Sequence, residues 1–276
     1  MTLSEPARPT PGLPRAVTLV RADNPGPMTL DGTNTYVLRT PGAAGCVVVD
    51  PGPDDAAHLD AVAHVVLEGC VAVLLTHRHA DHSAGAATLA ERLGVPVRAA
   101  LPDLCSPGAT PLADGEVLAV DGLQVVVVAT PGHTSDSVCL VLPDDGAVLT
   151  GDTVLGAGST VLMERDGGDL GDYLASLDVL ERLAGRARED VSVVGLPGHG
   201  PVVPDLGERV RAYREHRLAR LGEVRSVIDT AGLVADPADP ACVEAVVTAV
   251  YPDVSGRLRQ AAEQSARVQL AYLASR

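Results

Sequence analysis

The densest group of metal-binding side chain types in this chain lies at 76–82, Thr-His-Arg-His-Ala-Asp-His. Three imidazoles and a carboxylate fall within six residues, directly after an apolar run, and both are ligands that zinc accepts. Residues two apart on a helix point to nearly opposite sides, so His77 and His79 share a side only on an extended segment. We therefore expect a metal-binding loop after a strand, unlike the helical H-E-x-x-H motif. A polar loop without a metal would explain one histidine, but not this set.

Three more potential ligands follow later apolar runs in the same way. His133, Asp152 and His199 each lie just beyond a predicted strand, and each has a neighbouring glycine that permits close backbone approach. Because loops at strand ends build active sites, we expect these residues to join the first group. The remaining histidines lie on predicted helices, and for His58 and His64 we expect ordinary solvated side chains.

The elements that must position these side chains alternate in type over the first two thirds of the chain. Apolar periodicity and turn residues predict strands at 33–38, 46–50, 71–75, 95–99, 116–120, 123–129, 137–142, 147–150 and 191–195, with helices at 54–68, 83–93 and 170–183. From 205 onward no strand is predicted, and helices are expected at 205–230, 239–250 and 256–275. This shift divides the chain into a flexible leader (1–14), an α/β catalytic domain (15–204) and a helical C-terminal domain (205–276).

The order H-x-H-x-D-H, then His, Asp and His, resembles the metallo-β-lactamase superfamily over about residues 20–204. The resemblance implies a four-layer αββα sandwich that holds two Zn²⁺ ions per chain at one edge. It also implies the ligand sets: His77, His79 and His133 for the first zinc, Asp81, His82 and His199 for the second, and Asp152 bridging both. Such metals share and acidify a water, giving a bridging hydroxide that Asp81 helps to orient, and they polarise the scissile group.

Further stretches resemble the beta-lactamase-like protein 2 group within that superfamily. They are the residues 33–36 (TNTY), 131–134 (PGHT), 150–156 (TGDTVLG), 197–201 (PGHGP) and 213–217 (YREHR). In that group a small winged-helix-like domain follows the sandwich. Its members include an endoribonuclease that acts on single-stranded RNA, fungal acyl-carrier thioesterases and bacterial proteins resembling glyoxalase II.

Two activities follow from this resemblance. The first is glyoxalase II-like hydrolysis of a small-molecule acyl thioester or ester, which suits a chain with a net charge of −15 and only 2% aromatic residues. The second is cleavage of single-stranded RNA, with phosphate contacts from an arginine-rich helix. Its candidate residues are Arg211, Arg214, His216 and Arg217, which alternatively form a solvated helix face paired with Glu208, Glu215 and Glu223. Ser159 and Thr160 are candidates to line the substrate pocket.

Other members of the superfamily fit less well. Secreted zinc β-lactamases typically carry a cysteine in the second site and a signal peptide, whereas here Asp152 occupies that position and no signal is predicted. A mononuclear-iron persulfide dioxygenase shares much of the ligand pattern and stays open. A purely structural metal site would be closed by about four ligands, so a set of seven favours an enzyme.

The remaining features of the sequence concern compartment and partners. Five cysteines without a CxxC pair predict reduced core thiols in a cytoplasmic protein. No apolar stretch reaches 18 residues, so we expect no membrane segment. We infer no obligate protein partner from the sequence.

Overall fold

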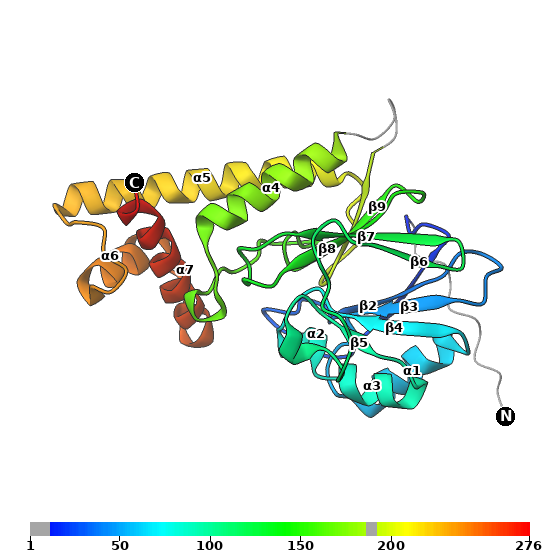
Figure 1. The fold of residues 1–276 in the computed structure, drawn as a ribbon. Helices are drawn as coiled ribbons and strands as arrows, with labels where there is room; N and C mark the ends of the chain where they lie inside the picture. Colours follow the sequence, from blue (N-terminus) through cyan, green and yellow to red (C-terminus); the bar gives the residue numbers. More distant parts are fainter. Residues whose placement is uncertain (1–11, 186–191) are drawn as a thin grey trace.

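The computed structural model describes residues 12–185 and 192–276, so the first eleven residues of the predicted leader lie outside the described residues. Two five-stranded sheets pack face to face, with helices on both outer surfaces (Figure 1). This arrangement confirms the predicted αββα sandwich. Among the described residues, no helix combines the length and the apolar character needed to cross a membrane.

The first sheet has the strand order β1-β2-β3-β4-β5. Its strands are β1 (Val17–Arg21), β2 (Asn34–Leu38), β3 (Cys46–Val49), β4 (Cys70–Leu74) and β5 (Val97–Arg98). The pairs β1–β2 and β2–β3 are antiparallel, whereas β3–β4 and β4–β5 are parallel. Parallel strands need a crossover, and here α1 (Ala56–Val66) and α3 (Ala86–Leu93) provide it and cover the outer face.

The second sheet has the order β10-β9-β8-β7-β6. Its strands are β6 (Val117–Val120), β7 (Leu123–Ala129), β8 (Val138–Leu142), β9 (Ala147–Gly151) and β10 (Val194–Pro197). All neighbours are antiparallel except β9 and β10, which run parallel and are joined through α4 (Leu170–Ala184). Helix α4 covers the outer face of this sheet.

The core between the two sheets consists of valine, leucine and alanine with one tyrosine, because the chain has neither phenylalanine nor tryptophan. Leu38 and Leu74 of the first sheet meet Leu140 and Leu149 of the second, and all four are fully buried. Tyr36 is also buried, and its hydroxyl donates a hydrogen bond to the Pro197 carbonyl at 2.8 Å. That bond ties the two sheets together next to the loop that carries His199.

The C-terminal part is helical, as predicted. Its helices are α5 (Leu206–Ala231), α6 (Pro240–Val250) and α7 (Gly256–Ala274), and residues 205–276 contain no strand that could form the wing of a winged helix. Asp205 caps α5 by accepting a hydrogen bond from the Glu208 amide, and Gly232 ends it in the left-handed conformation. Asp239 caps α6 in the same way.

Helix α5 belongs to two hydrophobic cores. Its first half packs Leu206, Val210 and Tyr213 against α4, whereas its second half packs Val224 and Ile228 against α6 and α7. The domain boundary at 205 therefore stays a prediction, because the separate core of the C-terminal helices begins about halfway along α5.

Three elements differ clearly from the predicted ones. Strand β1 was not predicted, and the helix expected at 83–93 is divided into α2 (Ala80–Ser83) and α3. The strand expected at 191–195 is found further along as β10, and residue 191 lies outside the described residues. Gly85 lies at the break, where its amide donates to the Gly52 carbonyl and a Cβ would come within 2.8 Å of the Pro53 carbonyl oxygen. The break thus holds α3 against the loop that follows β3.

Candidate metal centre

The seven predicted ligands come from loops that follow strands of both sheets. The loop after β4 carries His77 and His79, and α2 directly behind it carries Asp81 and His82. The other three follow β7, β9 and β10: His133, Asp152 and His199. Within each of three overlapping groups, the possible ligand atoms all lie within 4.8 Å of one another: His77, His79 and His133; His77, His82 and Asp152; Asp81, His82 and His199.

The first group presents three imidazole nitrogens to a common point. His79 Nδ1 lies 3.1 Å from both His77 Nε2 and His133 Nε2. His77 and His133 are buried, and His79 is partly exposed. In the group of Asp81, His82 and His199, His199 Nε2 lies 3.1 Å from both His82 Nε2 and Asp81 Oδ2.

Asp152 lies between the two groups. Its carboxylate oxygens are 3.4 Å from the Nε2 atoms of His82 and His199, and one of them is 3.9 Å from His133 Nε2. The structure therefore brings all seven predicted residues together, in the arrangement that two metal ions with a shared carboxylate would require. Their role as ligands stays a prediction.

Each of the five imidazoles is oriented by a hydrogen bond from its outer nitrogen. Bonding of one ring nitrogen fixes the tautomer and leaves the other free to bind a metal. The outer partners are Thr76 Oγ1 for His77 Nδ1 (3.0 Å), Asp166 Oδ2 for His79 Nε2 (3.3 Å), Asp50 Oδ2 for His82 Nδ1 (3.0 Å), Val161 O for His133 Nδ1 (3.0 Å) and Gly32 O for His199 Nδ1 (3.3 Å). The inner nitrogens all face the cluster.

The protonation of the cluster is set by burial and by Asp152. Burial lowers the pKa of His133 to about 4 and holds the pKa of His77 well below its usual range, so both are neutral at pH 7, the form that binds metal. Burial opposes the charge of His82 and His199 too, but Asp152 outweighs it and raises the pKa of His199 to about 9. The same contacts overcome burial at Asp152 and lower the pKa of its carboxyl.

One atom of the cluster tests directly whether a cation fits. Asp152 Oδ1 is buried and accepts no hydrogen bond from the described residues. A buried carboxylate oxygen without a hydrogen bond is costly unless a cation lies next to it. The cation beside Oδ1 in this structure is the His82 imidazolium, whose Nε2 is 3.4 Å away, and a metal ion between the two residues would take its place. With imidazole and carboxylate donors around it, the site fits borderline divalent ions such as Zn²⁺.

Asp50 contacts the candidate site, and this was not predicted from the sequence. Its side chain is buried at the end of β3, where it accepts hydrogen bonds from the Thr76 amide (2.8 Å), the Thr76 hydroxyl (2.7 Å) and His82 Nδ1. It thereby positions the first residue of the ligand loop and one ligand. The available signal was a carboxylate at the carboxyl end of an apolar strand, followed by Pro-Gly.

His58 corrects the prediction of a solvated helix histidine. It is buried on α1, and its Nε2 lies 2.9 Å from the Thr35 hydroxyl, which itself donates to the Asp50 carbonyl at 2.7 Å. Helical spacing could not identify this partner, which lies on another element. His64, on the same helix, is exposed as predicted.

Of the six candidate substrate contacts, Arg211 is exposed, and the other five are placed differently from one another. Thr160 is buried with its hydroxyl 3.3 Å from His133 Nδ1, and Ser159 is half-buried beside it. Arg217 donates to the Thr160 carbonyl and lies 5.1 Å above the Tyr173 ring. The other two lie outside these contacts: Arg214 forms an ion pair with Asp178 of α4, and His216 is exposed. The acidic partner of Arg214 is therefore none of the three glutamates that were expected.

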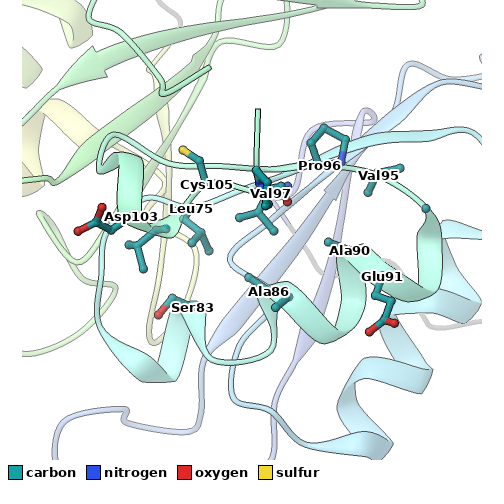
Figure 2. A pocket seen from close by; sticks show the side chains of 15 residues that line it. Leu75, Ser83, Ala86, Ala90, Glu91, Val95, Pro96, Val97, Asp103 and Cys105 are labelled. Carbon is teal, nitrogen blue, oxygen red and sulfur yellow. Dashed lines mark hydrogen bonds between the residues drawn. The ribbon is translucent and has the colours of Figure 1, made fainter. Parts of the chain in front are cut away.

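A separate cavity of about 640 Å³ lies behind the ligand loop, between α3 and the segment 94–107. Figure 2 shows its floor, formed by Leu75, Ala86, Ala90 and Val97. None of the seven predicted ligands lines it, although Leu75 and Ser83 lie on either side of the ligand loop. This cavity is thus distinct from the metal centre.

Residues 28–188 match the family described as Metallo-beta-lactamase superfamily. Three curated proteins are similar to this chain over most of its length. The lactamase-like protein nscB of Aspergillus fumigatus is 35% identical over 230 residues, which cover 79% of this chain and 64% of that protein. An atrochrysone carboxyl ACP thioesterase of Aspergillus chevalieri is 34% identical (78% of this chain, 66% of that protein). A Beta-lactamase-like protein 2 homolog of Caenorhabditis elegans is 34% identical (80% and 73%). The chain spans slightly less than two thirds of the length of the first two relatives.

Solved structures agree in fold. A metallo-beta-lactamase family protein from Thermus thermophilus superposes with a TM-score of 0.71 at 24% identity, covering 94% of this chain and 93% of that chain. TTHA1623, solved in a di-iron-bound form, superposes with a TM-score of 0.54 at 30% identity, covering 71% of this chain and 97% of that chain.

Proposed function

Because the chain belongs to the metallo-β-lactamase superfamily, we propose that it is a metal-dependent hydrolase that cleaves an acyl thioester or a related ester. One observation carries the proposal: seven imidazole and carboxylate side chains form three overlapping groups around Asp152, whose buried Oδ1 accepts no hydrogen bond from the described residues. Relatives that are named atrochrysone carboxyl ACP thioesterase support a thioester as the substrate. The similarity to a Beta-lactamase-like protein 2 homolog agrees with the subgroup that the sequence resembles.

The ligands divide into two sets with Asp152 between them. His77, His79 and His133 would hold one ion, and Asp81, His82 and His199 the other. When bound, divalent ions in such a site lower the pKa of a water molecule and polarise a carbonyl oxygen. We propose two zinc ions because imidazole and carboxylate donors suit this metal, although TTHA1623 was solved with iron.

We propose that Asp81 orients the attacking water. Its carboxylate is about one-third exposed, unlike that of Asp152, and its Oδ2 lies 3.1 Å from His199 Nε2. Burial opposes its ionisation, but His199 and His82 lower the pKa of this carboxyl overall. It is therefore an anion at neutral pH that can accept a hydrogen bond from water and hold it in one orientation.

A thioester suits the site because of its leaving group. A thiol has a pKa of about 8.5 and departs as the thiolate, whereas an amine needs a proton from a general acid. The groups around the predicted ligands are hydrogen-bond acceptors, and the imidazoles themselves are already engaged by them, so the site suits a leaving group that departs without a proton. This chemistry is sufficient for a thioester or an activated ester.

Cleavage of single-stranded RNA stays the alternative prediction, and no contact among the described residues favours it. The guanidinium groups of Arg214 and Arg217 are bound by Asp178 and by the Thr160 carbonyl, so both are already engaged within the protein. The net charge of −15 also repels a polyanion.

The test measures metal content and substrate range on the same protein. We expect about two equivalents of zinc by mass spectrometry of the purified protein, and hydrolysis of S-lactoylglutathione or an acyl-N-acetylcysteamine thioester that a chelator abolishes. His77→Ala should lower both metal content and turnover, the latter by at least about 100-fold, because it belongs to two of the three groups.

His64→Ala is the matched control, since this histidine lies exposed on α1 and should leave both quantities unchanged. Parallel assays with a single-stranded RNA and a β-lactam compare the alternative activities. Full turnover by chelator-treated, metal-free protein would contradict the proposal, and selective RNA cleavage would replace it with the alternative.

A further inference from the structure

Two adjoining cavities lie between the catalytic sandwich and α7. One, of about 420 Å³, is lined by Met28, Met163, Arg165, Gln260, Ala261, Glu263 and Gln264. The other, of about 240 Å³, is lined by Gly26, Pro27, Met28, Thr29 and Leu258. Because Met28 lines both, we treat them as one cleft, the α7 cleft. Figure 1 shows the first turns of α7 approaching the loop that precedes α4.

The two walls of the α7 cleft continue into the segments that orient opposite halves of the metal centre. On one side, the loop with Met28 leads to Gly32, whose carbonyl accepts from His199 Nδ1 at 3.3 Å. On the other side, Met163 lies two residues after Val161, whose carbonyl accepts from His133 Nδ1 at 3.0 Å. Both walls of the cleft are therefore only a few residues along the chain from groups that orient predicted ligands of both ions.

The cavity of the cleft that Leu258 lines is apolar and open to solvent. Met28 and Leu258 are among the large hydrophobic residues that stay exposed, at 43% and 45% of their surface, and Pro27 lies between them in the lining. Exposed apolar side chains that gather in a concave site indicate a ligand. Methionine side chains adapt to ligands of different shape, so Met28 and Met163 suit a flexible chain.

The other cavity of the cleft, which Gln264 lines, contains a hydrogen-bond acceptor without a donor. Gln264 Oε1 is buried and has no partner among the described residues. The helix cannot turn away freely, because the next residue, Ser265, is buried and its hydroxyl donates to the Leu162 carbonyl at 3.4 Å. A ligand group with an O–H or N–H would satisfy this oxygen.

We propose that the α7 cleft binds the acyl chain of the substrate: an extended apolar chain along Met28 and Leu258, with a hydroxyl or amide donor facing Gln264. This inference rests on the proposed hydrolysis of thioesters and states which acyl groups are selected. Long acyl groups are then preferred over acetyl, and a 3-hydroxyacyl group over the corresponding plain chain.

The first test is a series of thioesters of one thiol, with acyl chains of two to ten carbons. We expect kcat/KM to rise by up to about fourfold for each methylene group that enters the cleft. Met28→Ser and Leu258→Ser should flatten this series. Val234→Ser is the matched control, since Val234 is an exposed apolar residue outside the cleft, and its series should follow the wild type. Gln264→Met should remove the preference for the 3-hydroxyacyl thioester.

The second test detects binding without turnover. The chain has only three methionines, and two of them line the α7 cleft, so methyl-¹³C-methionine spectra report on it directly. Decanoate should shift the Met28 and Met163 signals in a saturable way, whereas acetate should not. The variants Met28→Leu and Met163→Leu assign the two signals.

The two tests separate this inference from the proposed function. Shifted methionine signals without thioester turnover would support the cleft and contradict the activity. Thioester turnover that ignores chain length, or signals that decanoate does not move, would overturn the cleft as the acyl site.

Discussion

Asp50 links the first sheet to the metal centre through three hydrogen bonds, to the amide and hydroxyl of Thr76 and to His82. A carboxylate that binds the outer nitrogen of a ligand histidine fixes the ring and raises its basicity. All five imidazoles have a hydrogen-bond partner on the outer nitrogen, and for two of them it is a carboxylate, so the geometry of the site depends on residues that would not touch the metal.

We predict that Asp50→Asn lowers the zinc affinity of the protein by about 10- to 100-fold, with a comparable loss of kcat/KM. Asparagine keeps the shape but loses the charge and one acceptor oxygen. Competition with a chromophoric chelator measures the affinity. Asp60→Asn, which removes the exposed ion pair with Arg92, serves as the control and should have no effect. An unchanged zinc affinity in Asp50→Asn would show that His82 does not depend on the Asp50 carboxylate for its orientation.

His58 makes the stability of the protein depend on pH. Burial lowers its pKa despite the nearby Asp55, so the folded state resists protonation while the unfolded chain titrates near pH 6.5. The unfolded state then binds more protons as the pH falls below about 6.5, and the free energy of unfolding decreases.

We predict that wild-type protein loses stability between about pH 7 and pH 5, and that His58→Gln weakens this dependence. Urea unfolding of the metal-free protein at several pH values measures it. His64→Gln, on the exposed side of the same helix, should keep the wild-type slope. Identical slopes in all three proteins would rule out this role for His58.

At the scale of elements, the loop after β7 is pressed against α4. Gly132 has a φ of +124°, and a Cβ there would lie 2.3 Å from the Tyr173 amide nitrogen. The glycine therefore permits a backbone-to-backbone contact that places His133, the next residue, at the metal centre.

We expect Gly132→Ala to lower the free energy of unfolding by about 3 kcal/mol or more, because left-handed strain adds to the clash with α4. Gly146→Ala is the matched control: its φ is +60° but no atom lies within 4 Å of the added Cβ, so about 1–2 kcal/mol is expected. Chemical denaturation compares the two. Equal losses would mean that α4 moves aside without cost.

Much of this organisation could be predicted from local sequence. Strands such as β7 and β9, and helices such as α5, carry their periodicity and their end signals within a few residues. The H-x-H-x-D-H loop is equally local, and its resemblance to a known family supplied the distant ligands.

The features that were missed depend on contacts between distant segments. Strand β1 is defined by its pairing with β2, and the break between α2 and α3 by a contact of Gly85 with the loop after β3. His58 is buried with its Nε2 beside the Thr35 hydroxyl, which belongs to another element. No periodicity within one segment encodes such partners.

At the scale of the whole molecule, the C-terminal helices share a hydrophobic cluster with the helix that covers the second sheet. Val268 of α7 joins the hydrophobic cluster of α4 and α5, and Tyr272 and Leu273 pack against it. The second half of α5 forms the centre of the other cluster, with α6 and α7.

We therefore predict a single cooperative unfolding transition for the full chain. A chain that ends at Gly232 should have a midpoint lower by about 10 °C or more, since the apolar faces of α4 and α5 lose their cover. Scanning calorimetry checks both statements. Two separate transitions, or a truncated protein of unchanged midpoint, would instead make residues 233–276 an autonomous domain.

The unbroken helix α5 fixes the spacing between the sandwich and the C-terminal helices. One rod of 26 residues begins beside the sandwich and ends among the C-terminal helices, so no jointed linker separates the two parts. We therefore expect the width of the α7 cleft to depend on the lengths of the side chains that line it, and not on a movement of α7 relative to the sandwich. To admit a larger ligand, side chains of α7 that line the cleft would have to be replaced by smaller ones, because α5 provides no flexible linker that could be lengthened.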